Sequence, residues 1–205
     1  MMRFCLIATV VLTLLSPGTF AAEAGDDGWK SLFDGKSLGN WKPNEHPENW
    51  TVEDGAIVGH GQRSHLYYMA EQFKDFEFQT DVMINEGGNS GIYLHIEHHP
   101  EGWFFDGHEV QINNSHVDPV RTGSLWGVIK LYETPVKDNE WFTVNILVKG
   151  QNIVVRVNGK IVVDYTEPTG TDGPRRLGKG YFALQQHDPG SSAKFRNIKV
   201  KRLPD

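Results

Sequence analysis

The chain has 205 residues, a formal net charge of −6 and a single cysteine. This length is enough for one domain with a substantial hydrophobic core. The acidic balance excludes a basic nucleic-acid surface and fits a protein whose partner is a small neutral molecule.

Residues 1–24 are predicted to be a signal peptide. The apolar run 4–15 follows a positive start, and the small residues Ala22 and Ala24 favour cleavage after Ala24. The run is too short to span a membrane. A single secreted or periplasmic domain is therefore expected over 25–205. It has no disulfides, because the only cysteine leaves with the signal.

Strict alternation of apolar and polar residues predicts the first long strand at 76–84. Phe76, Phe78, Val82 and Ile84 share one face, and acidic or amide side chains dominate the other. One buried and one polar face is typical of antiparallel sheets.

The next predicted strand, 90–97, carries polar groups on one face. Its alternation puts Tyr93, His95 and Glu97 on the face opposite the core. The residues expected in the core are Ile92, Leu94 and Ile96.

A second strand of this kind is predicted at 108–113. Glu109, Gln111 and Asn113 lie in line on its exposed face. The core-facing residues are Val110 and Ile112.

Two apolar runs at 142–148 and 153–157 predict a pair of strands. Asn158 and Gly159 then form a two-residue turn into 161–163, because both residues tolerate positive φ. The stretch 170–180 is expected to be a polar, mobile loop.

A third polar strand is predicted at 181–187, with Tyr181, Gln185 and His187 on its outer face. After it, Arg196 and Asn197 interrupt the alternation and predict a bulge in the last strand. Strands of this kind, joined by short polar turns, predict an all-β sandwich of two antiparallel sheets.

The three polar strands together suggest a hydrogen-bonding floor for a carbohydrate, because sugars offer many hydroxyl groups and few apolar atoms. Aromatic side chains for the sugar C–H faces are available in the flanking segments at Trp103, Phe104, Phe105 and Trp126. The plain alternative is the solvated face of an ordinary sheet. The predicted substrate-binding residues are Asn89, Tyr93, Trp103, Gln111, Asn113, Trp126 and Gln185.

Short motifs spread over residues 29–203 resemble those of a known family. They are Leu32-Phe33-Asp34-Gly35, Gly88-Asn89-Ser90-Gly91-Ile92, Glu109-Val110-Gln111, Glu140-Trp141 and Leu184-Gln185-Gln186-His187. The chain resembles the 3-keto-disaccharide hydrolase domain family. This resemblance implies a concanavalin A-like jelly-roll sandwich and cleavage of glycosides oxidised at C3 of the sugar. The chain departs from the family in having His95 in place of the usual Arg, and Trp126 in place of Tyr.

The mechanism follows from the number of carboxylates on the central strand. Glu109-x-Gln111-x-Asn113 offers one carboxylate, whereas ordinary glycosidases need two. A 3-keto sugar has an acidic C2 proton, so one base is enough for elimination or for net hydrolysis. Glu109 is predicted to be that base or a metal ligand. The alternative is a surface carboxylate paired with Arg121 or Lys130.

His187 or His95 is predicted to be the general acid, or a metal ligand. The sequence does not decide whether a divalent metal ion is bound; the candidate ligands are Glu109, His95, His108 and His187. A non-catalytic carbohydrate-binding module using the same face is the alternative function. Neither the identity of the sugar nor the oligomeric state follows from the sequence.

Overall fold

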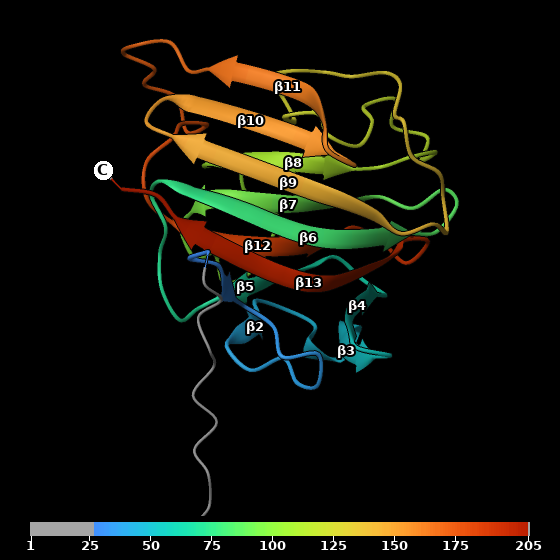
Figure 1. Ribbon diagram of the computed structural model, residues 1–205. Helices are drawn as coiled ribbons and strands as arrows, with labels where there is room; N and C mark the ends of the chain where they lie inside the picture. The colour runs from blue at the N-terminus through green and yellow to red at the C-terminus, as the bar shows by residue number, and fades with distance from the viewer. Residues whose placement is uncertain (1–26, 205) are drawn as a thin grey trace, which may run out of the picture.

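The computed structural model describes residues 27–204, so the predicted signal peptide lies outside the described residues. The chain forms two antiparallel sheets stacked face to face (Figure 1). The larger sheet contains β1 (Lys30–Ser31), β3 (Trp50–Glu53), β4 (Ala56–His60), β6 (Phe76–Ile84), β9 (Phe142–Lys149), β10 (Asn152–Val157), β11 (Lys160–Thr166) and β13 (Ser192–Arg202). The smaller sheet contains β2 (Trp41–Pro43), β5 (Ser64–Tyr68), β7 (Ser90–Ile96), β8 (His108–Ile112) and β12 (Tyr181–Gln186).

The strand order is β11-β10-β9-β6-β13-β4-β3 in the larger sheet, with β1 also paired to β13, and β2-β5-β12-β7-β8 in the smaller one. The only helical element in the described residues is a short 3₁₀ turn, Pro47–Asn49. The prediction of an all-β sandwich of two antiparallel sheets is confirmed. No helix within 27–204 is long and apolar enough to cross a membrane.

The core lies between the two sheets and is built by the predicted alternation. Every second residue of β6 is buried, from Phe76 to Ile84. The smaller sheet contributes Ile92, Val110 and Leu184 to the same cluster. Burying these side chains supplies the main stabilising term, at about 1.5–3 kcal/mol for each large apolar group.

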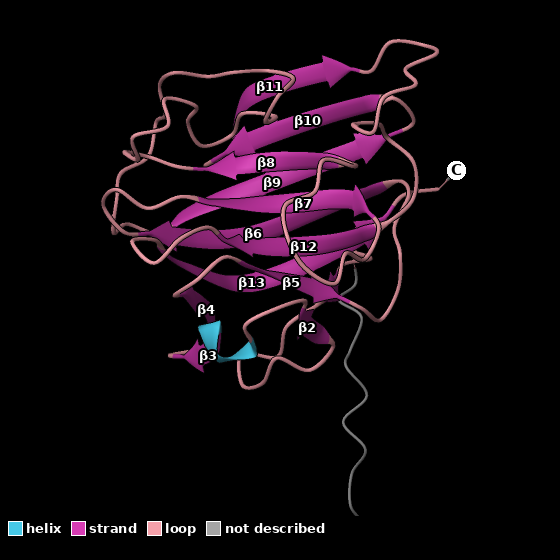
Figure 2. Cartoon of the chain, turned by 180° about the vertical axis from the view of Figure 1, so that it is seen from behind, coloured by secondary structure: helices cyan, strands magenta, loops and turns pink. Residues whose placement is uncertain are grey.

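The outer face of the smaller sheet is also covered. All residues of β7 and β8 are buried, unlike those of a sheet with one solvated face. A second apolar cluster, formed by Tyr67, Tyr93, Ile96, Phe104 and Ala183, lies on this side. Figure 2, seen from behind, shows loops crossing in front of these strands. This cover makes the outer face a recessed site and not a flat surface.

Two local predictions are confirmed. Asn158 and Gly159 both have positive φ, at 48° and 78°, in the turn that joins β10 to β11. The pairing of β13 with β6 shifts register between Arg196 and Lys199, and Asn197 has a φ of 54°. Both features arise from residues that adopt the left-handed region at low cost.

The alternation predicted for 90–97 is wrong at its end. His95 has a φ of 57°, and β7 advances three residues, from Tyr93 to Ile96, while β12 advances two. This bulge turns Ile96 to the outer face and sends the His95 ring towards core residue Phe76, with ring centroids 5.5 Å apart. Bulges re-aim side chains in this way, and nothing in the alternation of 90–97 reveals one.

Candidate active site

A pocket of about 260 Å³ opens on the outer face of the smaller sheet. Its floor comes from β7, β8 and β12, and its walls come from the loops that cover them. The residues lining it are Asn89, Tyr93, Trp103, Phe104, Phe105, Glu109, Gln111, Asp118, Trp126, Arg175, Gln185 and His187. Glu109, His187 and six of the seven predicted substrate-binding residues lie here; Asn113 is the exception.

Glu109 is a buried acid on the floor of the pocket, with 5% of its surface exposed. It lies directly across the β7–β8 pairing from Tyr93, whose hydroxyl donates a hydrogen bond of 2.8 Å to Oε2. Gln185 in turn donates to the Tyr93 hydroxyl oxygen at 3.0 Å. The alternative of a surface carboxylate paired with Arg121 is not what the structure has, because Arg121 donates to Asn113 and to loop carbonyls.

The environment of Glu109 prepares it for proton transfer near neutral pH. Burial raises the pKa of Glu109 to about 7, while the Tyr93 hydrogen bond and the positive charge of Arg175 oppose the rise. An acid or base is most effective when its pKa lies near the working pH. A carboxyl with this pKa on the pocket floor can take up or release a proton near neutral pH.

Gly91 leaves the space that Glu109 occupies. A Cβ added at Gly91 would lie 2.4 Å from Oε1 of Glu109 and 2.9 Å from its Cγ. Such distances are well inside van der Waals contact, so a side chain at position 91 is incompatible with this carboxylate position. Gly91 belongs to one of the family-like motifs, and here its function is steric.

The amides of the floor hold acceptor atoms that no protein group uses. Gln111 donates to Oδ1 of Asn89 at 2.8 Å, which fixes the orientation of both side chains. The remaining oxygens of Gln111 and Gln185 are buried and have no hydrogen-bond partner. A buried acceptor left without a donor costs free energy, so these atoms are suited to receive ligand hydroxyl groups.

Aromatic rings form the walls, as predicted. Trp103 and Phe105 are 46% and 55% exposed, which leaves ring surface available to a ligand. Trp126 and Phe105 stack with centroids 6.2 Å apart. Aromatic plates beside a floor of amides suit a sugar, which has apolar C–H faces and polar edges.

His187 lies at one side of the pocket, beside the Trp103 ring at 5.1 Å. Its Nδ1 donates to Oδ2 of Asp188 at 2.7 Å. Asp188 also accepts hydrogen bonds from the Gly190 amide at 2.8 Å and from the Ser191 hydroxyl at 3.0 Å. Burial acts against ionisation, but these donors still lower the pKa of Asp188. The charged Asp188 keeps the proton on Nδ1 and so leaves Nε2 of His187 for proton transfer.

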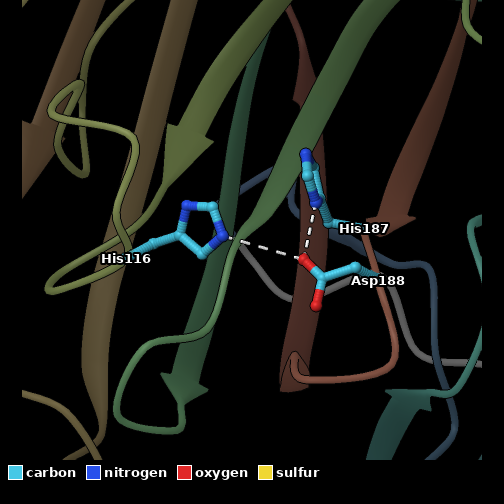
Figure 3. Close-up of side chains that lie close together, drawn as sticks. All are labelled: His116, His187 and Asp188. Carbon is cyan, nitrogen blue, oxygen red and sulfur yellow. Dashed lines mark hydrogen bonds and ion pairs between the residues drawn. The ribbon is translucent and has the colours of Figure 1, made fainter.

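Figure 3 shows that His116 points at the same carboxylate oxygen of Asp188 as His187 does, with Nε2 of His116 3.8 Å from Oδ2. His116, His187 and Asp188 each offer a metal-ligand atom, and these atoms lie within 4.8 Å of one another. Imidazoles and a carboxylate are ligand types that suit a divalent transition metal.

The hydrogen bonds of the cluster favour a different state. Nδ1 of His116 accepts the Asp118 amide at 3.0 Å, which puts the proton of the neutral ring on Nε2, the atom nearest Asp188. A metal-bound imidazole usually donates from its second nitrogen, and here that nitrogen is an acceptor. The cluster therefore fits a hydrogen-bonded group better than a metal centre.

Three predicted residues lie outside the pocket. Nε2 of His95 donates to the Lys74 carbonyl at 2.8 Å, and Nδ1 accepts the Gly178 amide at 3.1 Å. Burial lowers the pKa of His95 to about 4, so the ring is neutral and fully engaged. His108 is buried beside Glu167, at 3.3 Å. Neither histidine joins His187 in the pocket. The bulge in β7 turns the His95 ring towards the core, and His108 lies on the core-facing side of β8, together with Val110 and Ile112.

Asn113 is also corrected. Its Nδ2 donates to the carbonyls of Asp118 and Val120, both at 2.9 Å, and its Oδ1 accepts from the His116 amide. It lies just beyond the end of β8, so strand alternation no longer applies. Asn113 holds the 113–120 loop in place and does not line the pocket.

Four residues that shape this site were not predicted from the sequence: His116, Asp118, Arg175 and Asp188. All four lie in loops, where no periodicity predicts the direction of a side chain. The only signal available was Asp188 directly after His187, in a turn that continues with proline and glycine.

The comparison with protein families shows to which family the chain belongs. Residues 28–201 match the family described as the 3-keto-alpha-glucoside-1,2-lyase-like domain. The chain belongs to this family. Since the match covers nearly all of the described residues, the resemblance predicted from short motifs is confirmed.

Individual relatives agree with the family. The chain is 25% identical over 232 residues to a 3-keto-disaccharide hydrolase from Bacteroides thetaiotaomicron, covering 86% of this chain and 79% of that protein. The protein is therefore a carbohydrate-acting enzyme of this family.

Solved structures show the same fold. A crystal structure described as a glycosyl hydrolase, from Parabacteroides distasonis, has a TM-score of 0.76 at 23% identity and covers 91% of this chain and 99% of that one. A carbohydrate-binding module from Bacillus subtilis has a TM-score of 0.59 at 15% identity, covering 79% and 95% of the two chains. At these identities the likeness concerns the fold alone, and it confirms the predicted jelly-roll sandwich.

Proposed function

We propose that this enzyme cleaves glycosides whose sugar has already been oxidised to a ketone at C3. The observation that carries the proposal is Glu109, a buried carboxyl with a pKa of about 7 on the floor of a pocket lined mainly by amides and aromatic rings. A base of this strength is too weak to remove a proton from an ordinary sugar carbon. It is suited to the C2 proton of a 3-keto sugar, which the neighbouring ketone acidifies.

In the first step, Glu109 takes the proton from C2. The electron pair of the C–H bond forms a C2–C3 double bond, and the negative charge moves to the C3 oxygen. In the second step the ketone reforms, a C1–C2 double bond forms, and the bond from C1 to the leaving oxygen breaks. His187, held by Asp188, supplies the proton that this oxygen needs.

The product of elimination is an unsaturated 3-keto sugar and a free alcohol. Addition of water across its C1–C2 double bond then gives net hydrolysis. The acceptor atoms of Gln111 and Gln185 bind sugar hydroxyl groups, and Trp103, Phe105 and Trp126 contact the ring faces. We also propose export to the periplasm or outside the cell, from the signal-like residues 1–24.

Asp118 favours a second candidate function. It is another carboxylate lining the pocket, although its Oδ1 accepts the Val120 amide at 2.9 Å. Two carboxylates across a sugar ring are the arrangement used by ordinary glycosidases, which need no ketone. A third outcome is binding without turnover.

One experiment separates the three. The purified domain is incubated with a 3-keto disaccharide and, separately, with its unoxidised parent, while release of the leaving sugar is followed. Cleavage of the keto form alone supports the proposal. Cleavage of the parent at a similar rate supports the two-carboxylate mechanism, and saturable binding without cleavage of either sugar supports a binding module. The Glu109→Gln variant should lose cleavage and retain binding.

A further inference from the structure

Arg175 is the one arginine or lysine among the residues that line the pocket, all of which the structure describes. It comes from the loop between β11 and β12, the stretch that the sequence indicated only as polar and mobile. No strand positions it. Its placement therefore rests on the contacts that hold its guanidinium.

Those contacts are aromatic. The guanidinium carbon lies 4.5 Å from the centroid of the Trp126 ring and 5.6 Å from that of Phe105. Gly127, with a φ of +76°, leaves room for it, since an added Cβ would lie 3.0 Å from Nε of Arg175. A cation over two rings is fixed in orientation without using its N–H groups.

The guanidinium keeps donor capacity that the protein does not use. Nη1 of Arg175 is buried and has no hydrogen-bond partner. No carboxylate in 27–204 forms an ion pair with it at 4.0 Å or less. Its charge nevertheless acts on the base, because it lowers the pKa of both Glu109 and Tyr93 against the effect of burial. Arg175 is thus a cation close to the base but not neutralised by it.

We propose that Arg175 stabilises the negative charge that develops on the C3 oxygen when Glu109 removes the C2 proton. This inference rests on the proposed function. The substrate ketone is neutral and the enolate is charged, so an unpaired cation favours the enolate over the bound substrate. Interactions that strengthen only as charge develops raise kcat and leave substrate affinity nearly unchanged.

The same donor would suit a carboxylate on the substrate, and the two sources make different predictions. A substrate carboxylate is charged before any reaction, so its loss of contact with Arg175 would weaken binding. An enolate oxygen exists only during reaction, so its loss would slow the chemical step. Separate measurement of rate and affinity therefore distinguishes them.

The test uses a 3-keto sugar with hydrogen in place of the substituent at C1. This compound can lose and regain its C2 proton but cannot eliminate. In D₂O the wild-type protein should exchange C2–H for deuterium, which NMR follows directly. Glu109 removes the proton, and the same residue, now carrying solvent deuterium, returns a deuteron to C2.

Three variants are compared with the wild type. Arg175→Met removes the charge, and Arg175→Lys keeps it but loses the planar fork. Arg176→Met is the matched control, because it removes an equal charge from the exposed neighbouring residue, which lies outside this pocket. Calorimetry with the same keto sugar gives the affinity of each protein, and thermal unfolding confirms that each is folded.

The expected result is a loss of about 10²–10³-fold in exchange rate for Arg175→Met, as for removal of one oxyanion donor, with affinity changed by less than about threefold. Arg175→Lys should lie between, and Arg176→Met should match the wild type. An unchanged exchange rate, or weakened binding with an unchanged rate of exchange at saturation, would overturn the inference. If the wild type itself neither exchanges this sugar nor cleaves a 3-keto disaccharide, the proposed function fails and the inference fails with it.

Discussion

Replacing Gly91 with alanine is expected to displace the Glu109 carboxylate while the sheet stays folded. The new Cβ would lie 2.4 Å from Oε1, 2.9 Å from Cγ and 3.0 Å from the carboxyl carbon of Glu109. The atoms met are those of one side chain that borders the pocket, so Glu109 can move towards the open space. The backbone of β7 need not shift.

The size of the displacement follows from the same distances. Ordinary contacts of a Cβ begin at 3.4 Å, so Oε1 must move by about 1 Å. A misplacement of 1 Å in a catalytic group can cost about 10²-fold in rate. The strain of such overpacking is about 1–3 kcal/mol, and it is partly offset by the 0.5–1 kcal/mol that alanine gains over glycine within a strand.

The assay is steady-state cleavage of a 3-keto disaccharide by the wild type, Gly91→Ala and a control, Gly173→Ala. Gly173 has no atom within 4 Å of an added Cβ and does not have a positive φ, so the same chemical change there should have no effect. Gly91→Ala should lose about 10²-fold in kcat with a small change in melting temperature. A variant that retains wild-type kcat would show that the position of Glu109 is not critical.

Four further outcomes are expected. Because burial raises the pKa of Glu109 from 4.5 to about 7, the folded protein holds this proton more tightly than the unfolded chain. The contribution of Glu109 to stability is therefore fully present below pH 4.5 and is lost as the pH rises through 7. At pH 8.5, Glu109→Gln should therefore be more stable than the wild type by about 3 kcal/mol and unfold at a higher temperature. At pH 4.5 the two proteins should unfold at similar temperatures. A variant that is less stable than the wild type at pH 8.5 would contradict this. In the wild type, kcat/KM should fall below a pH of about 7 as Glu109 becomes protonated, and a profile that is flat from pH 5.5 to 8 would exclude Glu109 as the base. Asp188→Asn should lower kcat by about 10²-fold or more with little change in KM. Dialysis against EDTA should leave wild-type activity unchanged. If activity is lost to EDTA and restored by a divalent ion, His116, His187 and Asp188 form a metal site.

The strands and the pocket floor could be predicted because they depend on local pattern. Alternation in β6 and β8 records which face is buried, and Asn158-Gly159 specifies its turn through backbone conformation alone. Glu109, Gln111 and Gln185 were found by the same reasoning. Each lies within a regular strand, where position in the sequence decides the face.

The errors and omissions have physical causes. The positive φ of His95 reverses the faces of His95 and Ile96, and the stabilising hydrogen bonds come from Lys74 and Gly178, which are distant in sequence. The raised pKa of Glu109 depends on loops that cover the strand, not on the strand itself. Arg175 reaches the pocket by packing on Trp126, a contact that no short sequence motif specifies.

The most direct test of the central claim is the fate of the hydrogen at C2. A 3-keto disaccharide carrying deuterium at C2 of the oxidised sugar is treated with the enzyme in ordinary water, and the sugar product is analysed by mass spectrometry. Removal of the C2 proton by Glu109 predicts that the deuterium is absent from the product, whether this is the unsaturated sugar or its hydrate. The exchange of the keto sugar that lacks a C1 substituent shows independently whether Glu109 trades its proton with water. If it does, a product that keeps its deuterium would show that the C1–O bond breaks without C2 deprotonation, and the account given for Glu109 would be wrong.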